Sequence, residues 1–300
     1  MPNLLFTGAS GFLGHNILPA LRKEYDRVTT LGHLPTDDIT VNLINDVPNL
    51  QERYDIVLHA AGKAHVVPKT KEVEKAFYDV NFEGTKNLCS ALERVGTPKS
   101  FIFISTVAVY GCESGNLITE EHPLIGTTPY AKSKIMAERF LHDWCEKNGV
   151  KLTILRPSLL AGKNPPGNLG DMIRGIEKGF YVNISGGKVT KSILMADDIA
   201  NLIPLVSDKG GIYNVCDTDQ PSFGELAEVM AAQLGKRPPI SVPYWIAKIL
   251  AICGDVLGKR FPINSKRLDK LTMSLTFSNQ KALRELGWEP LKVLDNLQIR

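Results

Sequence analysis

The sequence predicts an α/β fold, with a doubly wound parallel sheet and a smaller C-terminal lobe. Short apolar runs alternate with helical patterns as far as Pro157, which is typical of parallel strands joined by crossover helices. Beyond Pro157 the alternation ends in a loop rich in Gly, Pro and Asn at 162–170. We therefore expect residues 1–160 to form the sheet core, to which some later segments return. Residues 161–300 are expected to form mainly a lobe over the ligand-binding edge of the sheet.

The composition is that of a soluble globular protein. The 300 residues are 43% hydrophobic and 22% charged, and the net charge of +3 forms no basic block, so nucleic acid is not an expected partner. The five cysteines form no C-x-x-C pair, which argues against a disulfide framework or a metal site. No basic and apolar leader is seen, and the apolar segment Trp245–Leu257 is too short to span a bilayer. This segment reads better as an amphipathic helix of the fold, and peripheral membrane contact stays open as the minor alternative. We expect a cytoplasmic protein with no integral membrane span.

The first predicted strand runs into a glycine-rich turn. Leu4–Thr7 is a short apolar run, and glycines follow at 8, 11 and 14 before a helix-like stretch. Glycines at a strand-to-helix turn let the backbone approach a pyrophosphate, which the free N–H groups of the helix N-terminus bind. The G-x-x-G-x-x-G spacing is therefore interpreted as a variant of the dinucleotide-binding turn of the Rossmann fold. Pro19 predicts a kink in this helix or a late start.

The second strand bears on the choice of cofactor. Val28–Leu31 is followed by Gly32 and His33, and no carboxylate stands where an acidic residue commonly binds the adenosine ribose. Asp37 and Asp38 come only later in the chain. A small residue next to His33, whose side chain can carry positive charge, leaves room for a 2′-phosphate. NAD and NADP therefore both remain open.

Two more strands follow, and small residues end the second of them. Ile39–Leu43 is a short candidate, whereas Tyr54–His59 is clearer and runs into Ala60–Gly62, where the backbone can pass close to a flat ligand. A helical pattern then extends over Val73–Arg94. Asn81 lies within that pattern, and its amide is a candidate for anchoring the backbone of the site.

A tyrosine and a lysine at helical spacing are the strongest candidates for catalysis. The predicted strand Ser100–Ser105 leads to Thr106 at its carboxyl end, where ligands bind in open parallel sheets. The helix after the next loop carries Tyr130 and Lys134, four residues apart and thus on one face. A phenol has a pKa of about 10, and a neighbouring ammonium is expected to lower it. The pair can therefore move a proton on and off a sugar or alcohol oxygen.

The remaining elements complete the sheet and the lobe. Leu152–Arg156 reads as another buried strand. Ser222–Glu225 fits a capping box that opens a helix, and Ser278–Leu286 fits a helix closed by Gly287.

Seven short motifs are spread along the chain. They are T-G-A-S-G-F-L-G at 7–14, H-A-A-G at 59–62, N-F-E-G-T at 81–85, S-T-V-A-V-Y-G at 105–111, Y-A-K-S-K at 130–134, R-P at 156–157 and L-R-E-L-G-W-E-P at 283–290. Each motif is weak alone, but together they run nearly from end to end of the chain. Together they resemble the motifs of extended short-chain dehydrogenase/reductases of the NAD-dependent epimerase/dehydratase family, which act mostly on nucleotide sugars.

The resemblance implies roles for the matching positions. Tyr130 is expected to be the acid/base, Lys134 to hold the nicotinamide ribose and lower the pKa of Tyr130, and Thr106 to hydrogen-bond the reacting oxygen. The residues expected to bind the cofactor, NAD or NADP, are Gly8, Ser10, Gly11, Phe12, Leu13, Gly14, Gly32, His33, Asn42, Leu43, His59, Ala60, Ala61, Gly62, Asn81, Ser105, Lys134, Arg156 and Pro157. Those expected to contact a nucleotide-sugar substrate are His65, Thr106, Val107, Tyr130, Asn168 and Lys191.

The same resemblance narrows the reaction. Family members that act as 4,6-dehydratases have an Asp-Glu pair directly after the threonine, where this chain has Val107 and Ala108, so dehydration is disfavoured. A 4-epimerase, which keeps NAD bound, and a 4-keto reductase, which exchanges NAD(P)H, both remain open. Residues 61–66 (A-G-K-A-H-V) resemble the A-A-R-V-H-V stretch of bacterial enzymes that reduce 4-keto-6-deoxy N-acetylhexosamine nucleotides in surface-polysaccharide assembly. That likeness implies that His65 lies near the sugar.

Two other functions share the cofactor motifs. A dihydroflavonol- or steroid-type alcohol dehydrogenase would have a substrate lobe without diphosphate contacts, whereas Lys191 stands where the family commonly has a diphosphate-binding Arg. A non-catalytic NAD(P)-binding regulator usually lacks the Tyr or the Lys, and both are present here. Family members often dimerise through the two helices that correspond to Val73–Arg94 and Tyr130–Gly149, so a homodimer is expected.

Overall fold

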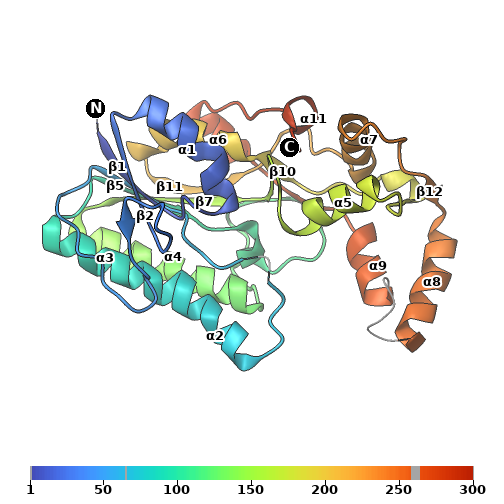
Figure 1. Ribbon diagram of the computed structural model, residues 1–300, viewed down its shortest axis with the longest axis horizontal. Helices are drawn as coiled ribbons and strands as arrows, with labels where there is room; N and C mark the ends of the chain where they lie inside the picture. The colour runs from blue at the N-terminus through green and yellow to red at the C-terminus, as the bar shows by residue number, and fades with distance from the viewer. Residues whose placement is uncertain (1, 65, 258–263, 300) are drawn as a thin grey trace.

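The computed structural model describes residues 2–64, 66–257 and 264–299. Its centre is a seven-stranded parallel sheet with the strand order β11-β7-β5-β4-β1-β2-β3 (Figure 1). Its strands are β1 (Asn3–Thr7), β2 (Arg27–Gly32), β3 (Ile39–Thr40), β4 (Ile56–His59), β5 (Ser100–Ile104), β7 (Lys151–Pro157) and β11 (Gly211–Val215). The predicted doubly wound sheet is confirmed.

Helices cover both faces of this sheet, which is why its central strands are apolar at nearly every position (Figure 1). One face packs against α1 (Phe12–Glu24) and α6 (Ala196–Ser207), and Leu4 and Phe6 of β1 belong to that core. The other face packs against α3 (Gly84–Val95) and α4 (Pro129–Asn148), and Leu5 belongs to that second core. Side chains of a strand alternate between faces, so β1 contributes to both layers.

The strand order creates a switch point beside β1. The chain runs outward from β1 to β2 and β3 on one side, and from β4 through β5 and β7 to β11 on the other. The carboxyl ends of β1 and β4 therefore border the crevice in which doubly wound sheets bind their ligands. Thr7 ends β1 and His59 ends β4, and the two are paired in the register of the sheet.

A second group of elements forms a lobe at one end of the molecule (Figure 1). Its helices are α5 (Gly167–Glu177), α7 (Phe223–Gln233), α8 (Tyr244–Leu257), α9 (Ser265–Thr272) and α11 (Val293–Asn296). Short parallel pairs join β8 (Leu159–Ala161) to β10 (Ile193–Met195), β9 (Asn183–Ile184) to β12 (Ser241–Val242), and β6 (Gly115–Ile118) to β13 (Leu275–Phe277). Later segments also return to the sheet, because β11, α6 and α10 (Gln280–Leu286) contribute to its cores.

The structure changes several predicted boundaries. The helix expected over Val73–Arg94 is α2 (Lys71–Tyr78), a π-helical turn η1 (Asp79–Glu83) and then α3. Pro19 does not delay α1, which begins directly at Phe12 and holds Pro19 inside it. The predicted capping box is confirmed, because the Ser222 side chain accepts from Glu225 N and the Glu225 carboxylate accepts from Ser222 N.

Candidate active site

The turn between β1 and α1 is built so that backbone, not side chain, faces the crevice. Gly8 has a φ of +81°, and a Cβ on it would lie 2.6 Å from the backbone of Ala60 and Ala61. A Cβ on Gly14 would lie 2.2 Å from the carbonyl oxygen of Ala9. Gly11 caps α1 without a side-chain hydrogen bond, so the N-terminal amides of the helix receive no side-chain cap. These features fit a pyrophosphate at the helix N-terminus.

A carboxylate stands at the end of β2 after all. The loop that follows folds back on Gly32, where a Cβ would lie 2.3 Å from Asp37 Oδ2. Leu34 N donates to Asp37 Oδ2 at 3.1 Å, and the Asp37 residue is only 7% exposed. The expectation that no carboxylate lies at this point is therefore wrong. The glycine is needed because any side chain there would displace the Asp37 carboxylate.

Asn81 ties three segments of the crevice together. Its Oδ1 accepts from Lys63 N at 2.7 Å, and its Nδ2 donates to Lys63 O at 3.1 Å and to Ser133 Oγ at 2.9 Å. A Cβ on Gly62 would lie 3.0 Å from Asn81 Oδ1 and 3.3 Å from Lys134 Nζ. Asn81 sits in the π-helical turn, a feature frequent at functional sites. The amide thus fixes the chain after β4 against the start of α4.

The Lys134 ammonium is buried and held by the end of β5. Its Nζ donates to the Ile104 carbonyl at 2.8 Å and lies 4.5 Å from the centre of the Phe103 ring. Burial lowers the pKa of Lys134 to about 8, although the Glu138 carboxylate acts in the opposite direction. The side chain therefore carries its charge at a fixed place one helical turn from Tyr130.

Tyr130 opens α4 and meets Thr106 across the sheet edge. Thr128 caps the helix by accepting from Ala131 N at 3.1 Å, so Tyr130 lies in its first turn. Burial raises the pKa of Tyr130, and a side-chain hydrogen bond with Thr106 opposes that rise. The lowered value expected from the Lys134 ammonium is therefore not found. The side chain is therefore protonated at neutral pH and has to lose that proton before it can act as a base.

His59 is a buried link between β1, β4 and α3. Its Nδ1 is 2.6 Å from Thr7 Oγ1 and its Nε2 is 2.9 Å from Thr85 Oγ1. The Thr85 hydroxyl donates its proton to Asn81 O at 2.8 Å, so it accepts a hydrogen bond from His59, and we assign the ring proton to Nε2. The unprotonated Nδ1 then accepts a hydrogen bond from the Thr7 hydroxyl. Burial and the Lys134 charge lower the pKa of His59 to about 3, so the ring is neutral.

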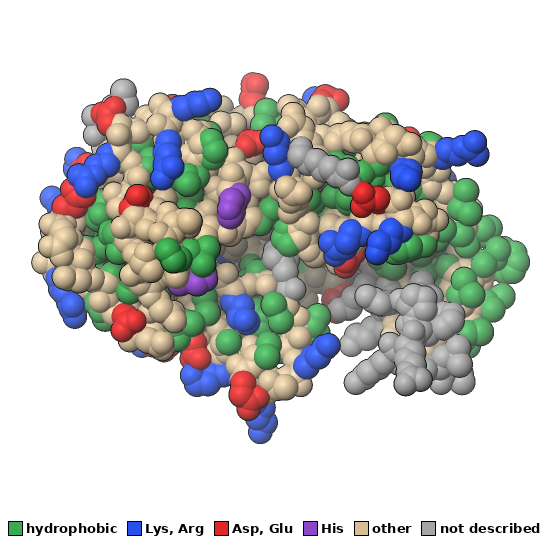
Figure 2. Space-filling view, viewed as in Figure 1, with side chains coloured by type: hydrophobic (Ala, Val, Ile, Leu, Met, Phe, Trp, Pro, Cys, Tyr) green, Lys and Arg blue, Asp and Glu red, His purple; other side chains and the backbone are tan. Residues whose placement is uncertain are grey.

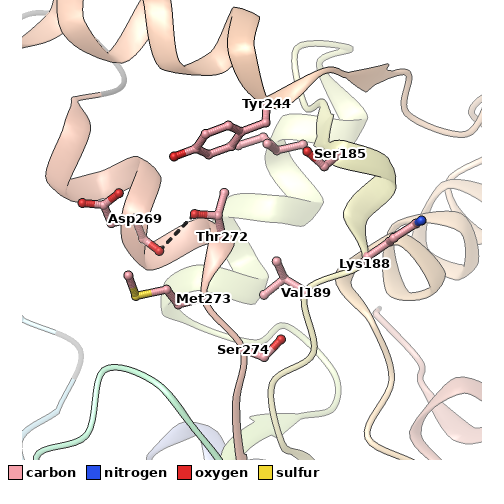
Figure 3. Close-up of a pocket in the computed structure, with 9 residues that line it drawn as sticks. Ser185, Lys188, Val189, Tyr244, Asp269, Thr272, Met273 and Ser274 are labelled. Carbon is pink, nitrogen blue, oxygen red and sulfur yellow. Dashed lines mark hydrogen bonds between the residues drawn. The ribbon is translucent and has the colours of Figure 1, made fainter.

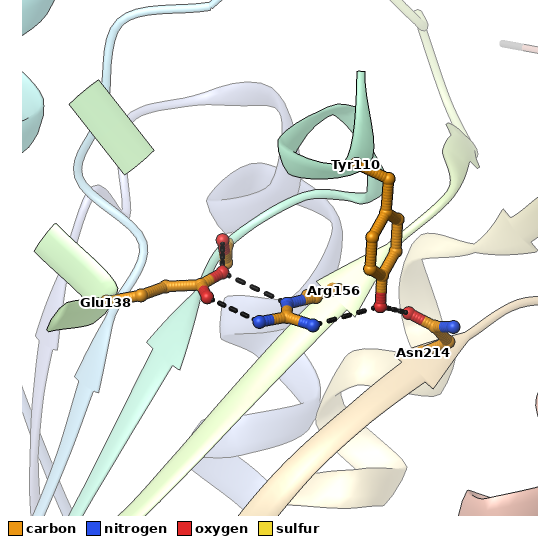
Figure 4. Close-up of polar contacts among 5 residues, drawn as sticks. Tyr110, Glu138, Arg156 and Asn214 are labelled. Carbon is orange, nitrogen blue, oxygen red and sulfur yellow. Dashed lines mark hydrogen bonds and ion pairs between the residues drawn. The ribbon is translucent and has the colours of Figure 1, made fainter. Parts of the chain in front are cut away.

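Ser105 and Arg156 belong to a buried polar network rather than to the open crevice (Figure 4). Arg156 donates to both carboxylate oxygens of Glu138, at 3.2 and 2.6 Å, and to Tyr110 Oη at 3.0 Å. Ser105 Oγ donates to the same carboxylate, and Tyr110 Oη donates to Asn214 Oδ1 at 2.7 Å. The guanidinium is thus occupied by Glu138 and Tyr110, and its expected contact with the cofactor finds no support in this geometry.

The other predicted cofactor residues lie around these groups. Ser10, Phe12 and Leu13 belong to the β1–α1 turn and the first turn of α1, His33 is exposed beyond Gly32, and Pro157 is buried as the last residue of β7. Asn42 and Leu43 follow β3, where the Leu43 carbonyl accepts from Asn87 Nδ2 at 2.8 Å and Asn42 Oδ1 accepts from Ile44 N at 3.2 Å. Asn42 therefore helps to fold its own loop, and Leu43 joins that loop to α3.

The predicted substrate residues come from several elements. Thr106 and Tyr130 meet at the sheet edge, and Val107 follows in the short helix η2 (Val107–Tyr110). Asn168 is exposed on the first turn of α5, and Lys191 forms a bridge with Leu275 in the lobe. His65 lies outside the described residues.

The lobe contains a separate pocket of about 540 Å³ (Figure 3). Its walls come from the segment around η3 (Ser185–Gly187), from α8 and from the end of α9. The lining residues are Ile184, Ser185, Lys188, Val189, Tyr244, Asp269, Thr272, Met273 and Ser274. None of them belongs to the Thr106–Tyr130–Lys134 group, and the sequence had given no sign of this pocket.

Among the described residues, no three His, Cys, Asp or Glu side chains are grouped as a metal site.

Ser133 and Asp37 were both missed as members of the site. Ser133 stands inside the Y-A-K-S-K motif, which offered a local signal for it. Asp37 had none, because only the fold of its loop brings it to Gly32.

A family model described as the NAD dependent epimerase/dehydratase family matches residues 4–216. The N-acetyl-alpha-D-glucosaminyl-diphospho-ditrans,octacis-undecaprenol 4-epimerase of Escherichia coli O157:H7 is 29% identical over 93% of this chain and 88% of its own length. The UDP-glucose 4-epimerase of Vibrio cholerae is 27% identical over 97% of this chain and 92% of its own.

Solved structures share the fold. A UDP-glucuronic acid 4-epimerase from Bacillus cereus, in complex with NAD, has a TM-score of 0.74 at 20% identity, over 98% of this chain and 93% of that one. RMD from Pseudomonas aeruginosa, complexed with NADPH, has a TM-score of 0.71 at 23% identity, over 99% and 96%. The chain therefore belongs to the NAD dependent epimerase/dehydratase family and is a nicotinamide-dependent enzyme.

Proposed function

We propose that this enzyme is an NAD-dependent 4-epimerase of a sugar carried on a diphosphate, in the first place a nucleotide sugar for surface polysaccharide. The observation that carries the proposal is the contact of Tyr130 with Thr106 at the sheet edge, with Lys134 one helical turn further along α4 and its Nζ on the Ile104 carbonyl. This group lies on the same carboxyl edge as the glycine turn after β1, where a dinucleotide fits. The 4-epimerase names of the two relatives above support the choice of reaction.

The proposed role of Tyr130 is to take the proton from the C4 hydroxyl as the phenolate, and to return that proton to the C4 oxygen as the phenol. Thr106 hydrogen-bonds the same oxygen and holds it beside the phenol. When bound, the nicotinamide supplies the hydride acceptor and donor at C4. Because burial raises the pKa of Tyr130, removal of its proton needs positive charge nearby, and the fixed Lys134 ammonium supplies such a charge. Val107 and Ala108 carry no acid or base, so water elimination is disfavoured.

The Asp37 carboxylate favours NAD over NADP. Oδ2 is engaged by Leu34 N, and none of the described residues is seen to donate to Oδ1. A carboxylate at the end of β2 can accept hydrogen bonds from the ribose hydroxyls of NAD, whereas it repels a 2′-phosphate. Since a resident NAD suits a reaction that removes and returns one hydride, this feature supports an epimerase more than a reductase.

The function is tested by incubating the purified enzyme with UDP-glucose, UDP-N-acetylglucosamine and polyprenyl-diphospho-N-acetylglucosamine, with no reductant added. Conversion of at least one of them to its C4 epimer, followed by proton NMR of the anomeric signal, is the expected result. The three substrates separate a nucleotide carrier from a lipid carrier. If no epimer forms from any of them, and a 4-keto nucleotide sugar consumes NADPH instead, the enzyme is a reductase and the proposal is overturned.

A further inference from the structure

Helix α8 carries its large apolar side chains on the outside. Trp245, Ile249 and Ile252 are 63%, 53% and 52% exposed, whereas the hydrophobic side chains of α8 described as buried are alanines. Ala247 is 4% exposed and Ala251 is fully buried. A surface helix of a soluble protein normally shows the opposite arrangement, with its apolar stripe against the core.

The exposed side chains form one stripe on the helix. Positions 245, 249 and 252 follow the i, i+4, i+7 spacing of a single face, and Leu250 extends it on one side. Figure 2 shows hydrophobic side chains gathered at the end of the molecule where α8 lies. The opposite side of α8 packs on α9, where Ala247 and Ala251 meet Leu268. The stripe therefore faces away from α9.

The sequence around this stripe is basic. From Tyr244 to Thr272 it contains six Lys or Arg residues and two Asp residues, although the whole chain has a net charge of only +3. An apolar stripe with Trp at one end, in a segment with an excess of positive charge, is the composition that binds an anionic bilayer surface. Of these basic residues, Lys248 lies on α8 itself and is exposed beside the stripe.

We propose that α8 docks this enzyme on the surface of an anionic lipid bilayer, with the Trp245–Ile249–Ile252 stripe in the interface. The contact is peripheral, because a 14-residue helix is about 21 Å long and the hydrocarbon core of a bilayer is about 30 Å thick. No described helix is long and apolar enough to cross a membrane. This inference goes beyond the proposed reaction, which does not require it.

Docking in this way would also orient the lobe pocket. Tyr244 is the first residue of α8, and it lies on the wall of the pocket in Figure 3. The pocket therefore lies beside the proposed contact.

The test is co-sedimentation of the full chain with sucrose-loaded vesicles of phosphatidylcholine and phosphatidylglycerol. Wild type is expected to sediment with vesicles that contain phosphatidylglycerol and less with pure phosphatidylcholine. The Trp245→Ser/Ile249→Ser/Ile252→Ser variant is expected to lose at least tenfold in partition. The matched control Leu117→Ser/Ile125→Ser/Phe180→Ser removes three equally exposed apolar side chains outside α8 and should bind as wild type does.

Three results would overturn the proposal. Wild type that stays in the supernatant with anionic vesicles excludes membrane docking. Equal losses in the stripe variant and in the control variant exclude a specific role for α8. The third result combines two measurements: wild type is dimeric in light scattering and binds no vesicles, and the stripe variant is monomeric. That result would show that a second copy of the chain covers the stripe. Circular dichroism checks that both variants fold, and none of these readouts depends on catalysis.

Discussion

At the residue scale, the proposed chemistry depends on one phenol. In Tyr130→Phe the ring keeps its contact with Phe77, whose ring centre lies 6.2 Å away, so packing is preserved and only the acid/base is removed. We expect turnover to fall about 10²- to 10⁴-fold while the dissociation constant of the dinucleotide changes by less than about twofold. Steady-state kinetics and calorimetric titration measure the two effects. A variant that retains more than a tenth of wild-type turnover would exclude Tyr130 as the acid/base.

A second prediction at this scale concerns the carboxylate beside Gly32. Asp37→Asn should weaken NAD binding about tenfold and leave NADP binding unchanged or improved, because a charge-assisted hydrogen bond is lost and a repulsion is removed. Asp38→Asn is the matched control, since the Asp38 carboxylate instead accepts from Thr30 N at 2.8 Å and Thr30 Oγ1 at 2.9 Å.

Isothermal titration calorimetry with NAD and with NADP gives the ratio of the two affinities for wild type and for each variant. The ratio for Asp38→Asn should match that of wild type. If Asp37→Asn also leaves the ratio unchanged, Asp37 does not determine the choice of cofactor.

At the scale of elements, the buried Glu138–Arg156 pair holds α4 on the sheet. Glu138 comes from α4 and Arg156 from β7, and Tyr110 joins them from η2 (Figure 4). Arg156→Met leaves the Glu138 carboxylate buried without its cation, and should lower the free energy of unfolding by about 3–5 kcal/mol in urea denaturation. Glu138→Met combined with Arg156→Met removes both charges and should recover a large part of that loss. A loss below about 1 kcal/mol for the single variant would show that the pair does not stabilise this junction.

The same elements explain how far sequence reasoning reached. Tyr130 and Lys134 were predictable because their relation is local, four residues apart on one helix. The glycine turn was predictable because its neighbours in sequence, a strand and a helix, are also its neighbours in space. Asn81 was predicted to be an anchor, but the π-helical turn that contains it was not predicted. The hydrophobic periodicity of a helix does not reveal a turn with one extra residue.

The remaining differences come from contacts between residues far apart in the chain. Arg156 meets Glu138 only because β7 packs under α4, so its engagement in a buried pair could not be inferred from an R-P motif. Asp37 reaches Gly32 only because its loop turns back on β2. Local patterns thus predict the elements and the candidate pair Tyr130 and Lys134, whereas tertiary folding decides which charged groups border the crevice.

At the scale of the whole molecule, one face of the sheet layer is a candidate for self-association. Phe82 and Phe140 are half-buried and lie 6.2 Å apart between ring centres, and Met136 is exposed one turn away on α4. We predict a homodimer through α2, α3 and α4, in which Met136→Glu places a charge at the contact and favours monomers. Multi-angle light scattering at micromolar concentration measures this, with Leu117→Glu as the control. A wild type that is only monomeric would contradict the prediction.

The dinucleotide content of the purified enzyme tests the central claim most directly. The protein is denatured, and the released dinucleotide is identified and counted by mass spectrometry. An NAD-dependent 4-epimerase, which returns each hydride to its substrate, is predicted to release close to one NAD per chain. A protein that releases none, and then binds NADPH more tightly than NADH, would contradict both the epimerase assignment and the role of Asp37.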